Sequence, residues 1–314
     1  MFLFWVPRYA PLRHPSNRAI MAPTGDERRT MLTQTLAPYK PEDHHQAIHL
    51  LSLARRKHIH LDWQRPGDWL GERNICCWVA RRGEGAAGLI GASVEQDGVA
   101  WLRLAAAEGE AYCDDASLMN ALWACLREDV AACGVRRMAV LLQDYWLRPF
   151  LRAWGFRGAN AVVTLSRTDG PTPSYPLPPL AIRDATLHDL PAIAQVDEAA
   201  FDSLWHYDEH TLWQAASYAA TFTVLTMNSA IIGYQLSTHH GSAGHLARLA
   251  IDPAHQGKGY GGLIVGEMLR FFARRNVMET SVNTQENNVR SLRLYTRLGF
   301  QATGHRVPVW TIEL

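Results

Sequence analysis

Apolar and polar positions along the second half of the chain follow both strand-like and helix-like periods. Two apolar runs rich in β-forming residues, 221–227 and 230–237, are separated by Asn228-Ser229, which favours a hairpin. Thr186 with Asp189 three residues later predicts a helix start, and Gly299 predicts a helix end. We expect strands at 180–184, 221–227, 230–237, 245–251, 280–282, around 300 and at 307–313, and helices after 186 and at 208–218, 259–275 and 288–297. This order predicts an α+β domain built on a mixed, mostly antiparallel sheet flanked by helices.

The first half of the chain looks like a weaker copy of the second half, displaced by about 145 residues. Trp101–Ala105 echoes Leu246–Ala250, and Phe150–Phe156 echoes Leu294–Phe300. A helix expected at 117–132 stands where the helix after Gly262 stands in the second half. The repeat predicts two domains of one fold in tandem, as the length of 314 residues also suggests.

The segment between the two copies is rich in proline. Residues 171–179 contain five prolines, which exclude a helix or a central strand and form a stiff spacer. We therefore expect an irregular N-terminal extension at 1–34, a first domain at 35–168, a proline-rich linker at 169–179 and a second domain at 180–314.

Charge and cysteine content exclude several classes of protein. The formal net charge is +1, which argues against a large nucleic-acid surface. No apolar run reaches the roughly 18 residues that span a membrane. The five cysteines are odd in number, lie in the first half and form no CxxC pair, so we expect neither a zinc site nor a disulfide framework. A reducing cytoplasm fits this usage.

The sharpest local signal is a glycine cluster between the strand at 245–251 and the helix at 259–275. It reads Gln256-Gly257-Lys258-Gly259-Tyr260-Gly261-Gly262. Glycines let the backbone approach a ligand closely, and free N–H groups at a helix start bind anions. The Lys-Ser or Lys-Thr of a P-loop is absent. The spacing also differs from the dinucleotide-binding G-x-G-x-x-G, and the preceding hairpin argues against the parallel order which that motif requires.

This loop resembles the acetyl-CoA loop of the GNAT superfamily of N-acetyltransferases, Gln/Arg-x-x-Gly-x-Gly/Ala, with Gln256, Gly259 and Gly261 in its places. A second block, Asn288 to Phe300, is similar to the family's N-x-x-A/S-x-x-L-Y-x-x-x-G-F signature. The resemblance covers about 135 residues, from Leu180 to Leu314. The tandem arrangement resembles mycothiol synthase, and the second half alone resembles ribosomal-protein alanine N-acetyltransferases.

The resemblance implies a role for each matching residue. The backbone of Leu249, Ala250 and Ile251 would pair with the pantetheine arm of acetyl-CoA, and the N–H groups from Gly257 to Gly262 would hold the pyrophosphate. Asn288 would contact the cofactor arm, although it is also placed to cap a helix. Tyr295 would lie near the CoA sulfur, where its hydroxyl can protonate the leaving thiolate.

The general base is not identifiable from the sequence. Some members of the family use a glutamate on the strand before the Asn288 helix, but that place is taken here by Asn283. Further candidates that could face the acceptor are Glu198, Asp202, His206, His239 and His240. Deprotonation of the amine through water would need no base at all.

The residues that the resemblance assigns to CoA binding and catalysis are not repeated in the first half. Its loop position, 111–116, has no glycine and carries two carboxylates, which would repel a pyrophosphate. Leu151 stands in the place of Tyr295, and Asp144 in that of Asn288. We expect a GNAT-like first domain that does not bind CoA, packs against the second domain and shapes the acceptor pocket.

The leading hypothesis is an enzyme that transfers an acetyl or short acyl group from acetyl-CoA, without a metal, to a primary amine. The amine belongs to a small molecule or to a peptide N-terminus, and neither a nucleic acid nor a membrane is expected as a partner. Two other hypotheses are a sensor that binds acyl-CoA without turnover and a structural scaffold.

Overall fold

The computed structural model describes residues 35–109, 112–168, 170 and 180–314. The N-terminal extension expected at 1–34, and all of the expected linker except Gly170, therefore lie outside the described residues. We call residues 35–168 the N-half and residues 180–314 the C-half.

Each half contains a series of strands with helices packed on them. In the N-half these are β1 (Thr35–Pro38), α1 (His44–Leu53), β2 (Arg56–Ile59), α2 (Pro66–Trp69), β3 (Ile75–Arg82), β4 (Gly85–Val94), β5 (Val99–Ala107), α3 (Tyr112–Ala132), β6 (Arg137–Leu141), α4 (Arg148–Ala153) and β7 (Arg157–Thr168). In the C-half they are β8 (Leu180–Asp184), α5 (Leu190–Ala200), α6 (Glu209–Ala216), β9 (Thr221–Met227), β10 (Ala230–His240), β11 (Ala243–Ile251), α7 (Tyr260–Ala273), β12 (Glu279–Gln285), α8 (Val289–Arg297) and β13 (Gln301–Glu313).

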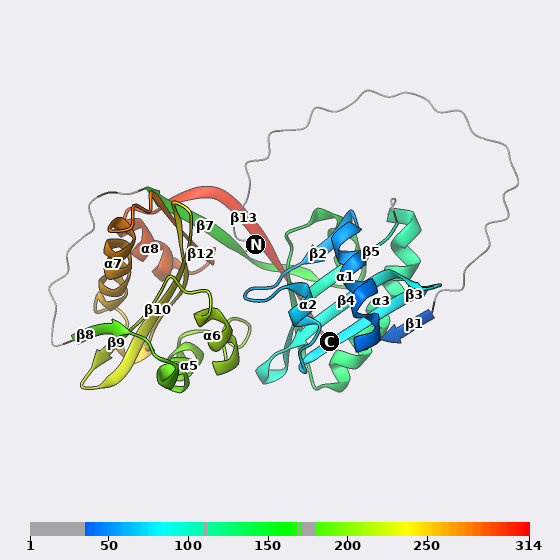
Figure 1. The fold of residues 1–314 in the computed structure, drawn as a ribbon, viewed down its shortest axis with the longest axis horizontal. Helices are drawn as coiled ribbons and strands as arrows, with labels where there is room; N and C mark the ends of the chain where they lie inside the picture. Colours follow the sequence, from blue (N-terminus) through cyan, green and yellow to red (C-terminus); the bar gives the residue numbers. More distant parts are fainter. Residues whose placement is uncertain (1–34, 110–111, 169, 171–179) are drawn as a thin grey trace, which may run out of the picture.

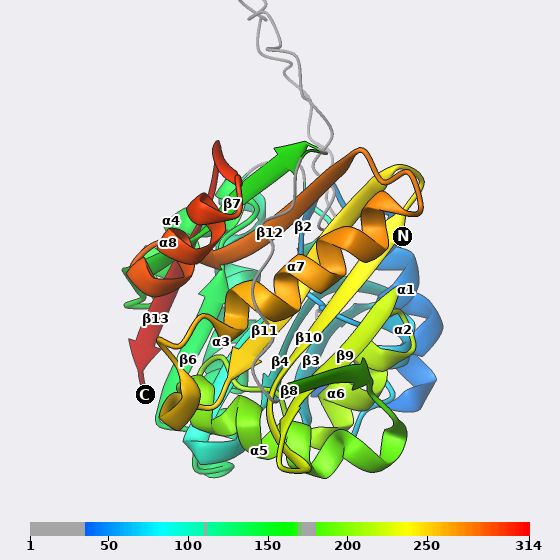
Figure 2. The ribbon, with the colours of Figure 1, turned by 90° about the vertical axis from the view of Figure 1, so that its left-hand side faces the viewer.

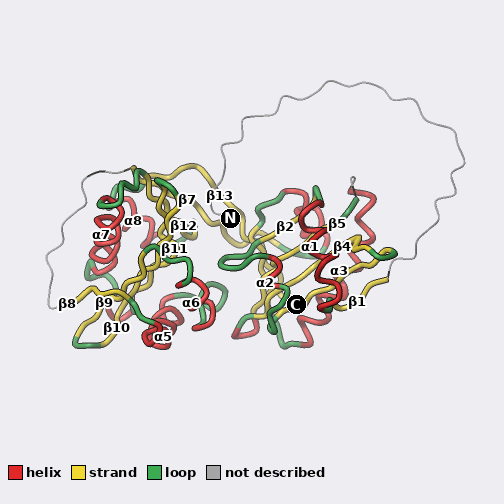
Figure 3. Tube along the Cα trace, viewed as in Figure 1, coloured by secondary structure: helices red, strands yellow, loops and turns green. Residues whose placement is uncertain are grey.

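All the described strands belong to one sheet that runs through both halves (Figures 1 and 3). Its order is β1-β3-β4-β5-β6-β13-β7-β12-β11-β10-β9-β8, with β2 paired to β5 off this path. Most neighbouring strands are antiparallel, and the pairs β5/β6 and β11/β12 are parallel. The expected α+β class with a mixed, mostly antiparallel sheet is confirmed.

The two halves exchange their last strands. β7, the last strand of the N-half, pairs with β12 of the C-half from Thr168↔Glu279 to Val162↔Gln285. β13, the last strand of the C-half, pairs with β6 of the N-half. β7 and β13 also pair with each other, so they form a two-stranded ribbon that joins the halves (Figure 1). The repeat in the sequence did not predict this exchange.

Local signals in the C-half predicted its elements well. Asn228 and Ser229 both adopt positive φ, at 51° and 68°, as a tight hairpin between β9 and β10 requires. Thr186 and Asp189 form the expected capping box. The two strands expected around Phe300 and at 307–313 are instead one strand, β13, whose register shifts between Ala302 and Arg306. Gly304 lies within this shift at φ 83°, a conformation that glycine adopts without strain.

Helices cover both faces of the C-half sheet. α7 lies across one face, where Leu263, Val265, Met268 and Phe272 enter a core shared with strand and α8 residues (Figure 2). α5 and α6 cover the opposite face through a separate cluster that includes Ile193, Leu212 and Tyr234. Among the described residues, no helix is both long enough and apolar enough to cross a membrane.

Candidate functional site

The site begins where β11 and β12 separate. These parallel strands pair from Ala243↔Glu279 to Leu246↔Val282, and within the described residues their pairing stops there. β12 continues along β7 as far as Gln285. The edge of β11 that carries Leu249 to Ile251 is therefore left without a strand on the β12 side. The expectation that the preceding hairpin argues against parallel order is wrong, because β11, α7 and β12 form a parallel β-α-β unit.

A β-bulge lies on β11 at the point of separation. Leu236 of β10 pairs with Arg248, but Ser237 pairs with Leu246, so Ala247 has no partner residue on β10. Such a bulge leaves one residue out of the ladder and bends the strand. It places Ala247 and Arg248 on the α5/α6 side, while Leu246 and Leu249 join the core under α7.

The glycine loop follows directly and opens α7. Gly257 and Gly259 have φ of 79° and 86°, and Gly259 is the N-cap of the helix. In the part of the chain that the structure describes, none of the backbone N–H groups from Gly257 to Gly262 donates to another backbone group. Free N–H groups at the positive end of a helix dipole are an arrangement that binds anions in proteins.

Side chains hold the loop against β11 and α8. The Gln256 Nε2 atom donates to the Ile251 carbonyl oxygen at 2.8 Å, and its Oε1 atom accepts from Arg290 of α8. A Cβ on Gly261 would lie 3.1 Å from the Leu294 side chain, so the loop packs closely against α8 at this position. The Lys258 ammonium bonds the Ala254 carbonyl at 3.1 Å. Tyr260 is half-buried and packs on the core under α7, and Gly262 is buried.

α8 carries the two remaining predicted residues. The Asn288 side chain caps α8 by accepting from the Ser291 N–H at 3.1 Å, the alternative role considered for it. Tyr295 is buried, with its ring 5.7 Å from that of Phe300. Burial raises the pKa of Tyr295, and the positive charge of Arg248 opposes this rise only in part. The hydroxyl is therefore protonated at neutral pH, as a proton donor must be.

A buried ion pair behind β11 is the main feature that sequence reasoning missed. Arg248 forms a two-point ion pair with Asp197 of α5, at 2.8 and 2.6 Å. Asp197 also accepts from the Tyr207 N–H at 2.6 Å and from the Tyr234 hydroxyl. Burial alone would lower the pKa of Arg248, but the Asp197 carboxylate outweighs it, and the pKa is raised. A lone arginine within the apolar run Leu246–Ile251 was the signal for this pair.

The arginine also fixes the loop between α5 and α6. Its guanidinium lies 3.7 Å from the ring centre of Phe201 and 4.0 Å from that of Tyr207, and it donates to the Trp205 carbonyl at 2.7 Å. Cation–π contacts of this kind strengthen when they are desolvated. The segment 201–207 is thereby anchored beside the bulge of β11.

The predicted general-base candidates do not converge on one point. Asn283 has an amide in place of a carboxylate, and its Oδ1 atom accepts a hydrogen bond from the Thr164 hydroxyl at 2.8 Å. Glu198 and Asp202 are exposed, as are His239 and His240 at the far end of β10 from the loop. His206 is half-buried within segment 201–207. Among the described residues, no group of three or more His, Cys, Asp and Glu is arranged to hold a metal ion.

A model of the acetyltransferase (GNAT) family matches residues 188–300, which include the split strand, the loop, α7 and α8. This segment is a GNAT acetyltransferase domain. The match begins before α5 and ends at Phe300, so the GNAT domain also contains Arg248, Asp197 and Tyr295. A search of curated proteins found no match to this chain.

Solved structures extend the likeness to both halves. A tandem GNAT protein from the clavulanic acid biosynthesis pathway is 16% identical, with 90% of this chain and 98% of that chain covered at a TM-score of 0.61. A GCN5-related N-acetyltransferase from Sphaerobacter thermophilus is 15% identical, with 89% and 95% covered at 0.57. A probable N-acyltransferase from Enterococcus faecalis V583 is 12% identical, with 90% and 72% covered at 0.66. At such identities the likeness shows a tandem GNAT fold and no activity.

The N-half has a different occupant at the position of the GNAT split strand. β5 and β6 are parallel from Val99↔Arg137 to Trp101↔Ala139, and the pairing with β6 ends there. Beyond that point β2 pairs with β5, from Ile59↔Leu104 to Arg56↔Ala107. By the internal repeat, Leu104 to Ala106 correspond to Leu249 to Ile251. In the N-half, a strand of the protein itself thus pairs with the edge of β5 that corresponds to the open edge of β11.

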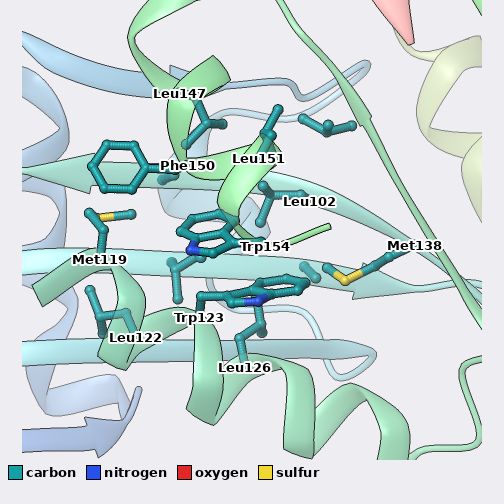
Figure 4. Packing of buried hydrophobic residues seen from close by; sticks show 14 of the residues in the cluster. Leu102, Met119, Leu122, Trp123, Leu126, Met138, Leu147, Phe150, Leu151 and Trp154 are labelled. Atoms are coloured by element: carbon teal, nitrogen blue, oxygen red, sulfur yellow. The ribbon is translucent and has the colours of Figure 1, made fainter. Parts of the chain in front are cut away.

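Large apolar side chains of the N-half pack around the helix that stands in the place of α8. Leu151, which replaces Tyr295, is buried beside Leu147 and Phe150 (Figure 4). Trp123 and Trp154 stack with ring centres 4.9 Å apart. Asp144, which replaces Asn288, lies 3.8 Å from the buried ring of His58. Most of the loop position at 111–116 falls outside the residues whose side chains are described.

Proposed function

We propose that the protein is an N-acyltransferase that moves an acetyl or short acyl group from acetyl-CoA to a primary amine. The observation that carries this proposal is the edge of β11 at Leu249 to Ile251, which no described strand pairs with on the β12 side. A loop whose N–H groups donate to no described backbone group follows close behind it. An extended pantetheine arm supplies the missing hydrogen bonds of such an edge. A pyrophosphate supplies the charge that the loop accepts.

The chemistry follows from the residues around the split. A neutral amine attacks the thioester carbonyl, and the oxyanion that forms accepts hydrogen bonds from backbone N–H groups at the Ala247 bulge. When the C–S bond breaks, the sulfur takes the proton of Tyr295, and the tyrosinate, whose pKa burial raises, then takes a proton back from water. The amine releases its proton to water, because the acidic and histidine candidates do not converge on the site.

We also propose that the N-half does not bind CoA, because β2 pairs with β5 where a pantetheine arm would lie and Leu151 stands in the place of Tyr295. The boundaries at 35–168 and 180–314, a cytoplasmic location and an amine acceptor are parts of the same proposal.

The test is release of CoA thiol from acetyl-CoA in the presence of a panel of primary amines. Amine-dependent release supports the acyltransferase. Binding of acetyl-CoA with no release for any amine supports the sensor instead, since a sensor needs no proton donor at Tyr295.

A further inference from the structure

The residues that follow β2 are bound to the N-half as far as Asp62 and contact the C-half at Trp63. The His60 N–H bonds the Arg103 carbonyl at 2.9 Å, and Asp62 forms an ion pair with the Arg103 guanidinium at 3.2 Å. Burial would raise the pKa of Asp62, but Arg103 outweighs it and keeps the carboxylate ionised. The segment 60–62 is therefore held firmly on β5.

Trp63, the next residue, packs on the C-half beside the split strand. It forms a buried cluster with Ala215 of α6 and Leu236 of β10, and Ala247, the bulge residue, packs against the same cluster. The Trp63 ring also stacks on Tyr218, with ring centres 6.3 Å apart. An N-half side chain thus lies on the α5/α6 side of the β11 bulge.

The halves meet along the same line at a second point. The Trp101 indole donates to the Leu204 carbonyl at 3.0 Å, and its ring lies 5.2 Å from Trp205 in an edge-on contact. Segment 201–207 is consequently clamped between Trp101 of the N-half and Arg248 of the C-half. The surroundings of the bulge are assembled from both halves.

Two polar atoms at this junction are buried without a partner. Among the described residues, neither the Trp63 Nε1–H group nor the His60 Nδ1 atom has a hydrogen-bond partner. Water cannot replace these partners easily, because only 9% of the Trp63 surface and 6% of the His60 surface are exposed. A buried polar group without a partner is costly, and in native proteins it usually has a specific reason. A ligand oxygen that accepts from the indole N–H is such a reason.

We propose that Trp63 is a specificity-determining residue of the acceptor site and that its indole N–H donates to a hydroxyl oxygen of a small primary amine. This inference rests on the proposed function. A small molecule fits the site better than a peptide N-terminus because the N-half packs against the surroundings of the bulge at two points, with Trp63 beside Ala247 and Trp101 against segment 201–207. The pairing of β2 with β5 fixes the position of the chain that follows β2, and it thereby places Trp63 against the C-half.

The test compares Trp63→Phe with the wild-type full chain on matched acceptors. The variant keeps an aromatic ring and removes the N–H. The acceptors are three pairs: glucosamine and cyclohexylamine, serinol and isopropylamine, and the amides Ser-Ala-Ala and Ala-Ala-Ala. The control is Trp146→Phe, which removes an indole N–H that already donates to the Lys57 carbonyl at 3.0 Å within the N-half.

We expect the wild type to prefer the hydroxylated small amines to their plain counterparts and to the peptides. We expect Trp63→Phe to lower kcat/KM for the hydroxylated member by about ten-fold, as the loss of one hydrogen bond does. The plain amine, the affinity for acetyl-CoA and the Trp146→Phe control should change less than two-fold.

Each other outcome contradicts the inference in a distinct way. Equal losses for both members of a pair in Trp63→Phe would show that the ring packs and the N–H donates nothing to the acceptor. A preference for the peptide amides would overturn the small-molecule class. Turnover of no amine by the wild type would overturn the proposed function together with this inference.

Discussion

Replacing Asp197 by asparagine should be strongly destabilising, because it leaves the charge of Arg248 buried without a counter-charge. The Asp197 side chain is fully buried, and that of Arg248 is 10% exposed. The carboxylate accepts from the Arg248 guanidinium, the Tyr207 N–H and the Tyr234 hydroxyl. An asparagine offers one acceptor oxygen and points an NH₂ group at some of these donors.

Removing one partner of a buried ion pair costs about 3–5 kcal/mol of the free energy of unfolding. We expect a loss of this size in urea unfolding followed by tryptophan fluorescence. The control is Glu313→Gln, which breaks the exposed pair between Arg137 and Glu313 at 2.7 Å. Exposed pairs contribute about 0–1 kcal/mol, so this control should remain close to the wild type.

The double variant Asp197→Leu, Arg248→Met separates charge from packing. It leaves no unpaired charge behind β11, so it should be more stable than Asp197→Asn alone. A loss below about 1 kcal/mol for Asp197→Asn, or a double variant that is less stable than the single one, would refute the role given to this pair.

Three further predictions concern the site itself. Tyr295→Phe should lower kcat by about 10²–10⁴-fold, as the loss of a general acid does, with KM for acetyl-CoA unchanged; unaltered turnover would remove Tyr295 from the mechanism. Gly259→Glu should abolish acetyl-CoA binding in calorimetry, whereas Gly134→Glu, at a similar φ of 80° and with equally open surroundings, should not; equal effects would point to general backbone strain. Burial lowers the pKa of His245 to about 4 and that of His60 to about 3, from 6.5. Because the unfolded chain binds the protons first, each histidine should cost about 1.4 kcal/mol of unfolding free energy per pH unit as pH falls from 6.5 to 4. Replacing His245 by asparagine should reduce the change in the urea unfolding midpoint between pH 7 and pH 5. A midpoint that changes with pH as steeply as in the wild type would contradict the burial argument.

The glycine loop and the α8 signature were predictable because their chemistry is local. Loop, helix start and cap lie within a few residues of one another, and positive φ at Gly257 and Gly259 follows from residue type. The hairpin at Asn228-Ser229 was predictable for the same reason. The order of β11 and β12 was not, because a hairpin before β11 does not determine what pairs on its other edge.

The exchange of β7 and β13 could not be read from the sequence. Both strands end their repeats in equivalent places, and nothing in their pattern of apolar residues distinguishes a partner in the same half from one in the other half. β2 was missed because its residues, Arg56 to Ile59, are few and mostly polar. The pair Asp197–Arg248 joins residues 51 positions apart, so only the tertiary structure shows that the two charges compensate each other.

Calorimetric titration of acetyl-CoA into the full-length protein tests the central claim most directly, because the two halves of this tandem GNAT fold differ in what occupies the split strand. The account predicts one site per chain, since β11 offers an open edge and β2 covers the edge of β5. Two sites would show that β2 does not exclude the cofactor from the N-half. Absence of binding would contradict the assignment of the Gln256–Gly262 loop as an acetyl-CoA site.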